Sequence, residues 1–173
     1  MEFFEKDLEE IIFLSDKEEL SERGLFIEGN LKRQLRIGHY GIADLVETKR
    51  PRVLTGGGFK KGLITVYELK NNKIGVSTFF QALNYLKGIQ SYIRLRGFEG
   101  FFNYKIILIG RHFDRDSSFC YLPEIFPKPE IHYESCYDNR TYVELYTYSY
   151  SLLGINFKEV RDYDLIDNGF KIK

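Results

Sequence analysis

The sequence has few cysteines and no long apolar run, and both absences exclude classes of protein. Cys120 and Cys136 are its only cysteines, too few for a disulfide framework, which favours a reducing compartment. A zinc site that combined them with His132 would lack a fourth ligand at close spacing. No segment approaches the ~20 apolar residues that span a bilayer, and the first residues lack the basic region of a secretory signal. We therefore expect a cytoplasmic protein with no membrane partner.

The composition leaves room for one ordinary globular domain. The chain has 173 residues, of which 43% are hydrophobic and 29% are charged, and these values disfavour disorder, collagen and coiled coil. It contains no internal repeat, low-complexity tract or linker. We expect a single domain over residues 1–173.

The net charge of zero conceals an uneven distribution of charge along the chain. Residues 2–28 carry ten acidic and three basic side chains, whereas residues 29–115 carry sixteen basic and five acidic ones. A run of charge is most often only a solvated face. A basic middle in a neutral protein nevertheless indicates an anionic partner, and nucleic acid is the first candidate.

Hydrophobic periodicity predicts an α/β protein. Apolar residues recur at helical spacing near the N-terminus, and the period changes to two beyond Gly24. A later continuous apolar run, placed after an amphipathic helix, is typical of a buried parallel strand. The segment 114–139 is expected to form loops and short edge strands. The other expected elements are a helix over about 3–12, a short helix opening at Ser15, strands over 31–37, 42–48 and 63–70, a helix from an N-cap at Ser77 to Arg96, and strands over 104–110 and 141–152.

The second and third strands are expected to form one long hairpin. Gly56, the first of three consecutive glycines, is the midpoint between Asp44 and Glu68. A hairpin folded there pairs residues whose numbers sum to 112, so Asp44 faces Glu68 and Val46 faces Val66. Because side chains alternate between the faces of a strand, both acids should lie on one face of the sheet.

Two carboxylates on neighbouring strands repel each other unless a cation lies between them. Mg²⁺ is commonly held by one or two carboxylates together with phosphate oxygens and water. Lys70, on the same face as Asp44 and Glu68, could polarise a water or stabilise charge in the transition state. The plainer interpretation is a surface strand with a Glu and Lys pair and an Asp opposite. The apolar neighbours of both acids argue against it, because a charge among apolar residues needs a compensating partner.

Asp44 on one strand, followed by Glu68-Leu-Lys70 on the next, resembles the motif of the PD-(D/E)XK nuclease superfamily. The resemblance implies a restriction-endonuclease-like core over about residues 4–111, in the order helix, three antiparallel strands, helix, parallel strand. Residues 112–173 would then add further β strands at the C-terminal end.

The same resemblance implies a metal site. Asp44 and Glu68 would hold Mg²⁺ or Mn²⁺ with help from the Leu69 carbonyl, while Lys70 would serve electrostatic or base chemistry. The sequence departs from the family pattern in having Ala43, rather than proline, before the aspartate.

Three further residues match features of this superfamily. Glu9, at the end of Glu5-Lys-Asp-Leu-Glu9, is similar to an acid of its first helix. Gln34 resembles a residue of the strand beside its site, and Gln81 resembles a glutamine of its second helix. We expect Glu9 to complete the metal shell, and Gln34 and Gln81 to contact a phosphate or the site water. The alternative for Glu9 is a solvated acid on a surface helix.

Basic residues flank the glycines of the hairpin connection, and we expect them to contact a nucleic-acid backbone. The glycines themselves are not a Walker loop, because no Lys-Ser or Lys-Thr follows them on a helix. The alternating tyrosines over 142–150 are expected to pack on the sheet rather than to stack on bases. The basic residues are Lys49, Arg50, Arg52, Lys60 and Lys61.

The expected function is that of a Mg²⁺- or Mn²⁺-dependent nuclease that hydrolyses phosphodiester bonds, with DNA as the expected substrate and water as the nucleophile. The alternative is a non-cleaving DNA-binding or protein-interaction module on the same fold, such as a phage or mobile-element factor. A different metal-dependent hydrolase is a weaker third interpretation. The sequence leaves open a homodimer, DNA against RNA, and endonuclease against exonuclease action.

Overall fold

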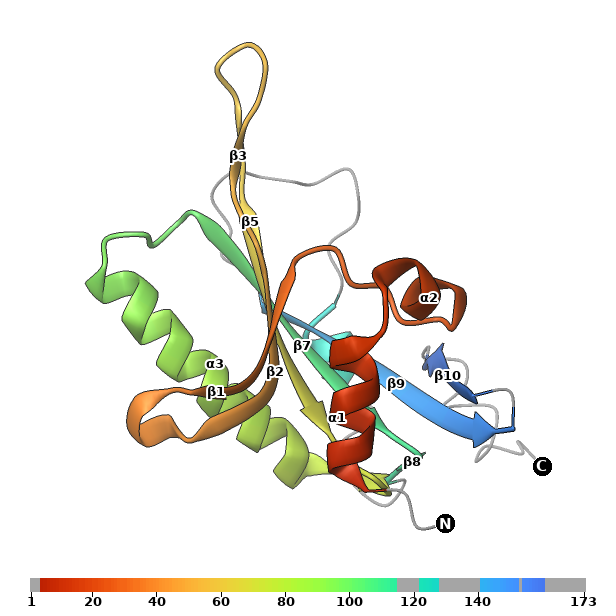
Figure 1. The fold of residues 1–173 in the computed structure, drawn as a ribbon. Coiled ribbons are helices and arrows are strands. Elements are labelled where there is room, and N and C mark those ends of the chain that lie inside the picture. The colour runs from red at the N-terminus through yellow and green to blue at the C-terminus, as the bar shows by residue number, and fades with distance from the viewer. Residues whose placement is uncertain (1–3, 115–121, 128–140, 153, 161–173) are drawn as a thin grey trace, which may run out of the picture.

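The computed structural model describes residues 4–114, 122–127, 141–152 and 154–160. It is a mixed α/β structure on a central sheet of six strands, in the order β1-β2-β5-β7-β9-β10 (Figure 1). The elements are α1 (Glu5–Leu14), α2 (Lys17–Glu22), β1 (Asn30–Arg36), the 3-10 helix η1 (Gly38–Tyr40), β2 (Ile42–Lys49), β3 (Arg52–Val53), β4 (Phe59–Lys60), β5 (Gly62–Leu69), β6 (Lys73–Ile74), α3 (Val76–Leu95), β7 (Phe102–Gly110), β8 (His112–Phe113), α4 (Leu122–Ile125), β9 (Thr141–Ser151) and β10 (Gly154–Glu159).

Strand direction changes across the sheet. β1, β2 and β5 are antiparallel neighbours, whereas β5, β7 and β9 run parallel, and β10 returns antiparallel to β9. Parallel neighbours need a long crossover connection, and α3 supplies it between β5 and β7. The α/β class expected from the sequence is confirmed.

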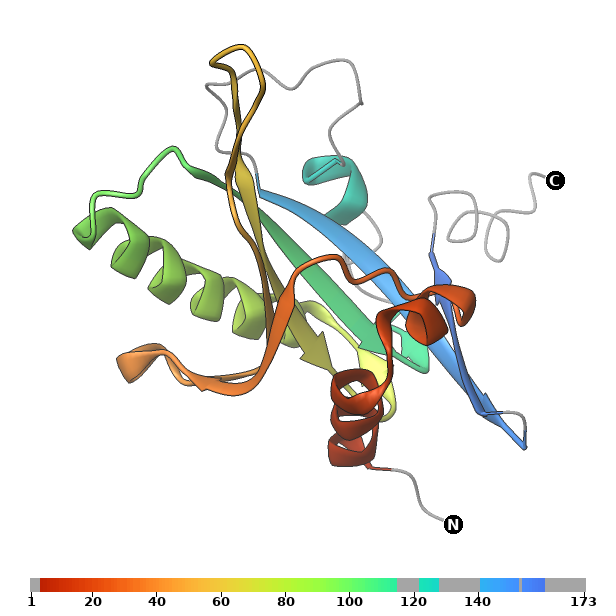
Figure 2. The ribbon, with the colours of Figure 1, turned by 45° about the horizontal axis from the view of Figure 1, so that its top comes forward.

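The sheet is covered on both faces over its middle strands (Figure 2). On one face, Leu86 of α3 packs in a buried cluster with Val66 of β5. On the other face, Leu8 of α1 packs with Tyr67 and Ile107. Burial on both faces explains why the central strands have long apolar runs in the sequence.

Two helix starts differ from the sequence expectation. α3 begins one residue before Ser77, with Gly75 as its N-cap, and the Gly75 N–H donates to the Thr78 hydroxyl at 3.4 Å. α2 has Asp16, not Ser15, as its N-cap. Several small or polar residues precede each helix, and the local sequence does not show which of them is the N-cap.

The change of period expected at Gly24 coincides with the end of α2. Gly24 has φ +92°, a conformation that costs glycine little, and the Leu25 N–H donates to the Leu20 carbonyl at 2.8 Å to close α2.

The C-terminal part of the described chain adds β9 and β10 to the sheet. Tyr146 and Tyr148 are buried, whereas Tyr150 is exposed, so most of the tyrosine row packs as expected. The helix α4 lies in the segment where only loops and edge strands were expected. Cys120, His132 and Cys136 fall outside the described residues. Within them, no helix has the length and apolar character needed to cross a membrane.

Candidate active site

The hairpin register expected from the sequence is confirmed. Leu45 pairs with Tyr67, and Val46 pairs with Val66, on β2 and β5. The same register continues beyond the sheet, where Arg52 of β3 pairs with Lys60 of β4. The turn therefore lies at the triple glycine, and the opposite end of the hairpin brings the two acids near each other.

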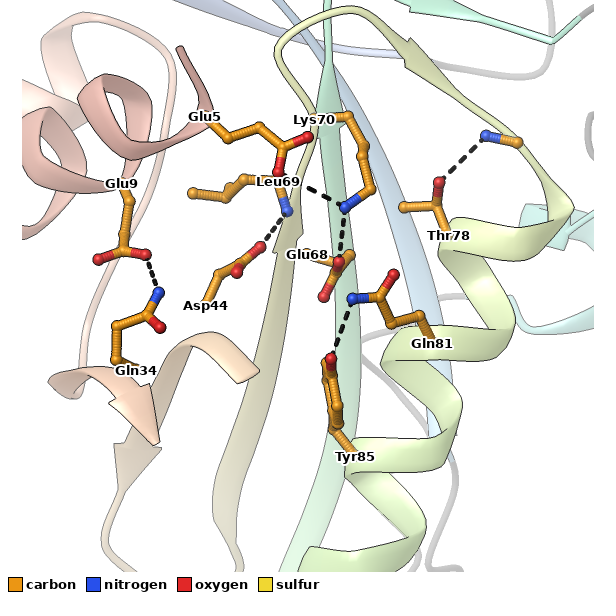
Figure 3. Close-up of polar contacts among 11 residues, drawn as sticks. Glu5, Glu9, Gln34, Asp44, Glu68, Leu69, Lys70, Thr78, Gln81 and Tyr85 are labelled. Carbon is orange, nitrogen blue, oxygen red and sulfur yellow. Dashed lines mark hydrogen bonds and ion pairs between the residues drawn. The ribbon is translucent and has the colours of Figure 1, made fainter. Parts of the chain in front are cut away.

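β2 and β5 stop pairing at the position of Asp44. Their described ladder ends at Leu45 and Tyr67, and the Leu69 N–H instead donates to the Asp44 Oδ2 at 2.9 Å (Figure 3). A side-chain carboxylate thus replaces a strand carbonyl as the acceptor. This hydrogen bond fixes Asp44 beside the C-terminal end of β5.

Strict alternation along β2, which the sequence argument assumed, is wrong at this point. Ala43 packs in the same cluster as Val46 on the α3 side, whereas Leu45 packs on the α1 side. Residues 43 and 45 would share a face in a regular strand. The strand is therefore irregular at Asp44, and its carboxylate lies at the junction of β2 and β5.

Gln34 of β1 lies opposite this irregularity. The pairs on either side are Arg33 with Leu45 and Leu35 with Ala43, so Gln34 lies across from Asp44. Gln34 has φ +50°, and it is the one non-glycine residue with a positive φ in the described part of the chain. Strain of this kind persists where surrounding contacts impose it, and it is frequent at functional sites.

Glu68 is the most deeply buried acid of the group. Its exposed fraction is 0%, the Lys70 Nζ lies 2.8 Å from its Oε1, and its Oε2 has no hydrogen-bond partner among the described residues. Burial, followed by the nearby charge of Asp44, raises the pKa of Glu68 to about 7. A buried carboxylate oxygen without a donor is the kind of group that a cation would satisfy.

The pKa of Asp44 is also raised. Burial raises its pKa, while the Leu69 N–H and the charge of Lys70 oppose the change. The charges of Glu5 and Glu9 add to the increase in the pKa of Asp44, as acids do when they share a site.

Lys70 remains a cation in this environment. Burial lowers its pKa, but the hydrogen bond and charge of Glu68 and the charges of Glu5 and Asp44 outweigh that effect, so the net change is upward. The Lys70 Nζ also lies 3.7 Å from the Glu5 Oε2. A lysine held in its charged form suits electrostatic stabilisation better than the base chemistry considered from the sequence.

Glu9 of α1 is held by two donors. Arg33 Nε lies 2.9 Å from its Oε1, and the Gln34 amide donates to its Oε2. Gln34, although exposed, thus contacts the Glu9 carboxylate in this arrangement. The structure places Glu9 next to the site, with its Oε2 accepting a hydrogen bond and its Oε1 in an ion pair but without a hydrogen-bond partner among the described residues.

A pocket of about 430 Å³ opens beside these residues. The sequence did not predict Glu5 or Arg33 as site residues, although Glu5 begins the motif that contains Glu9 and Arg33 directly precedes Gln34. Glu5 lies four residues before Glu9 on the same face of α1, and that spacing was the available signal. The lining residues are Glu5, Lys6, Glu9, Arg33, Gln34 and Asp44.

Gln81 lies on the first turns of α3. It is exposed, and its amide donates to the Tyr85 hydroxyl at 2.9 Å (Figure 3). Tyr85 is buried against Gly41, where a Cβ would lie 2.8 Å from the ring. α3 packs on the face of β5 that carries Val66, and Glu68 follows Val66 by two residues, so Gln81 extends from the helix that covers the side of Glu68.

The available metal ligands are few. The described residues contain no group of three or more His, Cys, Asp or Glu side chains placed to hold a metal ion. Asp44 and Glu68 are thus two acids without a third. One feature of this pair suits a divalent cation: the buried Oε2 of Glu68 has no hydrogen-bond partner among the described residues. Leu69 stands between Glu68 and Lys70 at the end of β5, which is where its carbonyl was expected to assist.

The five basic residues of the hairpin connection are not at this site. Lys49 pairs with Glu28, and the others lie on or beside β3 and β4. Lys60 precedes Glu68 by eight residues along an extended chain, which corresponds to about 26 Å. These five residues remain candidates for contacting nucleic acid at a point far from Asp44 and Glu68.

Comparisons with protein-family models, with curated proteins and with solved structures found no match for this chain.

Proposed function

We propose that this protein is a metal-dependent nuclease that hydrolyses phosphodiester bonds, with DNA as its first candidate substrate. The observation that carries the proposal is an acid pair, half-buried Asp44 and fully buried Glu68, with Lys70 in contact with Glu68. One oxygen of Glu68 has no described donor, and its pKa is raised to about 7. Groups with strongly perturbed pKa values, gathered beside a pocket, are frequent in active sites.

The order of elements supports the same proposal. A helix, three antiparallel strands, a crossover helix and a parallel strand follow one another in the chain, with the two acids and the lysine at the end of the central hairpin. This is the arrangement expected of a restriction-endonuclease-like core. Fold alone does not establish chemistry, and the side chains of Asp44, Glu68 and Lys70 are what point to phosphodiester hydrolysis.

The metal proposed is Mg²⁺ or Mn²⁺, held by Asp44, Glu68 and the Leu69 carbonyl. Such an ion would supply Lewis-acid activation of the phosphodiester and of a water. Binding requires both carboxylates to be ionised, so Glu68 must lose its proton first. Lys70 then remains as the nearest cation and can stabilise negative charge that develops on the phosphate.

Residues of α1 and β1 would position the substrate. Arg33 lines the pocket while it is held by Glu9, and a guanidinium is suited to bind a phosphate oxygen. Gln34 is fixed in place by its contact with Glu9. Gln81, near Glu68 on α3, offers an amide to a phosphate or a water.

A non-cleaving binding module is the second candidate, and one observation favours it. Only two acids are available as ligands among the described residues, and the Lys70 ammonium already occupies one oxygen of Glu68. A protein that had lost its metal could keep this ion pair as a structural feature. It would bind nucleic acid without cutting it.

Cleavage assays separate the two candidates. The wild-type protein is incubated with supercoiled DNA, linear duplex, single-stranded DNA and RNA, each with Mg²⁺, Mn²⁺ or a chelator. The proposal predicts cleavage of at least one substrate with metal, none with chelator, and none by Glu68→Gln. Unchanged nucleic-acid binding in chelator, with no cleavage under any condition, would support the binding module instead.

A further inference from the structure

The hairpin of β2 and β5 extends beyond the sheet as a two-stranded ribbon, here called the basic arm, residues 50–61. Figures 1 and 2 show it projecting from the body of the molecule. Its strands keep the sheet register, and the Leu54 N–H donates to the Gly58 carbonyl at 2.7 Å near the tip. Gly56 and Gly57 adopt positive φ there, as a tight turn requires.

The two faces of the basic arm differ in chemistry. Residues paired across two strands share a face, so Arg52 and Lys60 lie on one side, and Val53 and Phe59 lie on the other. The Phe59 ring packs edge-on against Phe101, with 5.2 Å between centroids. Phe59 thus contacts the body of the molecule while Val53 beside it stays exposed, and Arg52 and Lys60 lie on the opposite side of the ribbon.

The charge of the basic arm is of one sign. It contains two arginines and two lysines and no acid, and Arg52 and Lys60 are exposed. The major groove of B-DNA admits a two-stranded β ribbon, and the groove is bordered by phosphates on both sides. The shape and the charge of the arm therefore both match a duplex.

The position of the arm sets a distance along that duplex. Lys60 and Glu68 lie about 26 Å apart along the extended chain, or roughly eight base-pair steps of about 3.4 Å. We infer that the basic arm inserts into the major groove of a duplex substrate roughly eight base pairs from the phosphate that is cut. This inference rests on the proposed function, because it takes the acid pair as the point of cleavage.

The test measures duplex binding without cleavage, in chelator, at several salt concentrations. Wild type is compared with the double variant Arg52→Ala/Lys60→Ala. Each lost phosphate contact lowers the salt slope of log affinity by ~0.9 for B-DNA, so the double variant should lose roughly two units of slope. Lys32→Ala/Lys87→Ala removes the same charge from exposed positions outside the arm and should leave the slope unchanged. Arg52→Lys/Lys60→Arg should restore it.

The length of the duplex provides the second readout. Wild type should bind a duplex of about 16 base pairs at least tenfold more tightly than a hairpin-capped one of about 6, which cannot span both sites. The Arg52→Ala/Lys60→Ala variant should bind both equally. The inference would be overturned if the double variant kept the wild-type salt slope or the wild-type dependence on duplex length. It would also be overturned if the variant lost as much affinity for anionic vesicles as for the duplex. If the variant loses salt slope but wild type shows no metal-dependent cleavage, duplex binding by the basic arm is supported and the nuclease function is rejected. If wild type cleaves but the variant keeps the wild-type slope, the nuclease function is supported and duplex binding by the arm is rejected.

Discussion

The Leu69 N–H donates to the Asp44 Oδ2 at 2.9 Å, and through this hydrogen bond a side chain continues the pairing that the backbones of β2 and β5 have ended. The contact places Asp44 beside Glu68 without a regular cross-strand pair. Asp44, the proposed metal ligand, thus also accepts a structural hydrogen bond, and substitutions can separate these two roles.

Asp44→Asn keeps an oxygen for the Leu69 N–H, whereas Asp44→Ala leaves that N–H without a partner. We expect Asp44→Ala to lower the free energy of unfolding by about 1–3 kcal/mol, and Asp44→Asn to lower it by less. Both should weaken Mn²⁺ binding. Urea unfolding and metal titration check the pair, and equal stability of the two variants would show that the Leu69 contact contributes nothing.

Glu68 should make stability depend on pH. Its pKa rises from its usual 4.5 to about 7 in the folded protein, so the unfolded chain releases this proton at lower pH than the folded one does. Stability contributed by the protonated form is therefore present below pH 4.5 and is lost as pH rises toward 7. The size of the loss is roughly 3 kcal/mol.

Glu68→Gln should remove that part of the pH dependence. Relative to its own stability at pH 4, the variant should lose less than wild type on going to pH 8, as measured by urea unfolding without metal. Glu10→Gln, at an exposed acid of α1, is the matched control and should follow the wild-type curve. Parallel curves for Glu68→Gln and wild type would contradict the raised pKa.

Lys70 should matter to rate rather than to binding. Its ammonium stays charged beside Glu68 and Glu5, where it can stabilise charge that appears only in the transition state. We expect Lys70→Ala to lower the cleavage rate by about 10²–10³ while Mn²⁺ and DNA binding stay nearly intact. Lys70→Met keeps the apolar stem and should behave alike. Cleavage at the wild-type rate by either variant would remove Lys70 from the mechanism.

The backbone of Gln34 offers a test of strain. Glycine adopts φ +50° at little cost, whereas alanine keeps the strain and loses the amide contact to Glu9. Gln34→Gly should therefore be more stable than Gln34→Ala by about 1 kcal/mol in urea unfolding. If alanine were the more stable replacement, the left-handed conformation would not be imposed by the fold.

The sequence predicted the parts of the site that depend on periodicity. The register of the hairpin followed from its central glycines, and it predicted that Asp44 lies near Glu68. Period-two reasoning failed at Asp44 itself, where β2 is irregular, Gln34 with its positive φ lies opposite, and the Asp44 side chain accepts a hydrogen bond from Leu69. No local signal encodes these features.

Contacts from α1 were also beyond the reach of sequence. Glu5 lies near Lys70 only because α1 packs over the end of β5, sixty-five positions away in the chain. The basic residues were expected to contact a nucleic-acid backbone, and their distance from the acids depends on the straight extension of β3 and β4. Charge counts carry no information about that direction.

The central claim is that a divalent cation binds between Asp44 and Glu68, and Mn²⁺ titration calorimetry at pH 8 tests it most directly. The pH is chosen because Glu68, with a pKa of about 7, is mostly ionised there. The account predicts one saturable site in wild type and in the control Glu10→Gln, with binding lost in Glu68→Ala and weakened below pH 7. An identical isotherm for wild type and Glu68→Ala, or no binding by wild type, would contradict it.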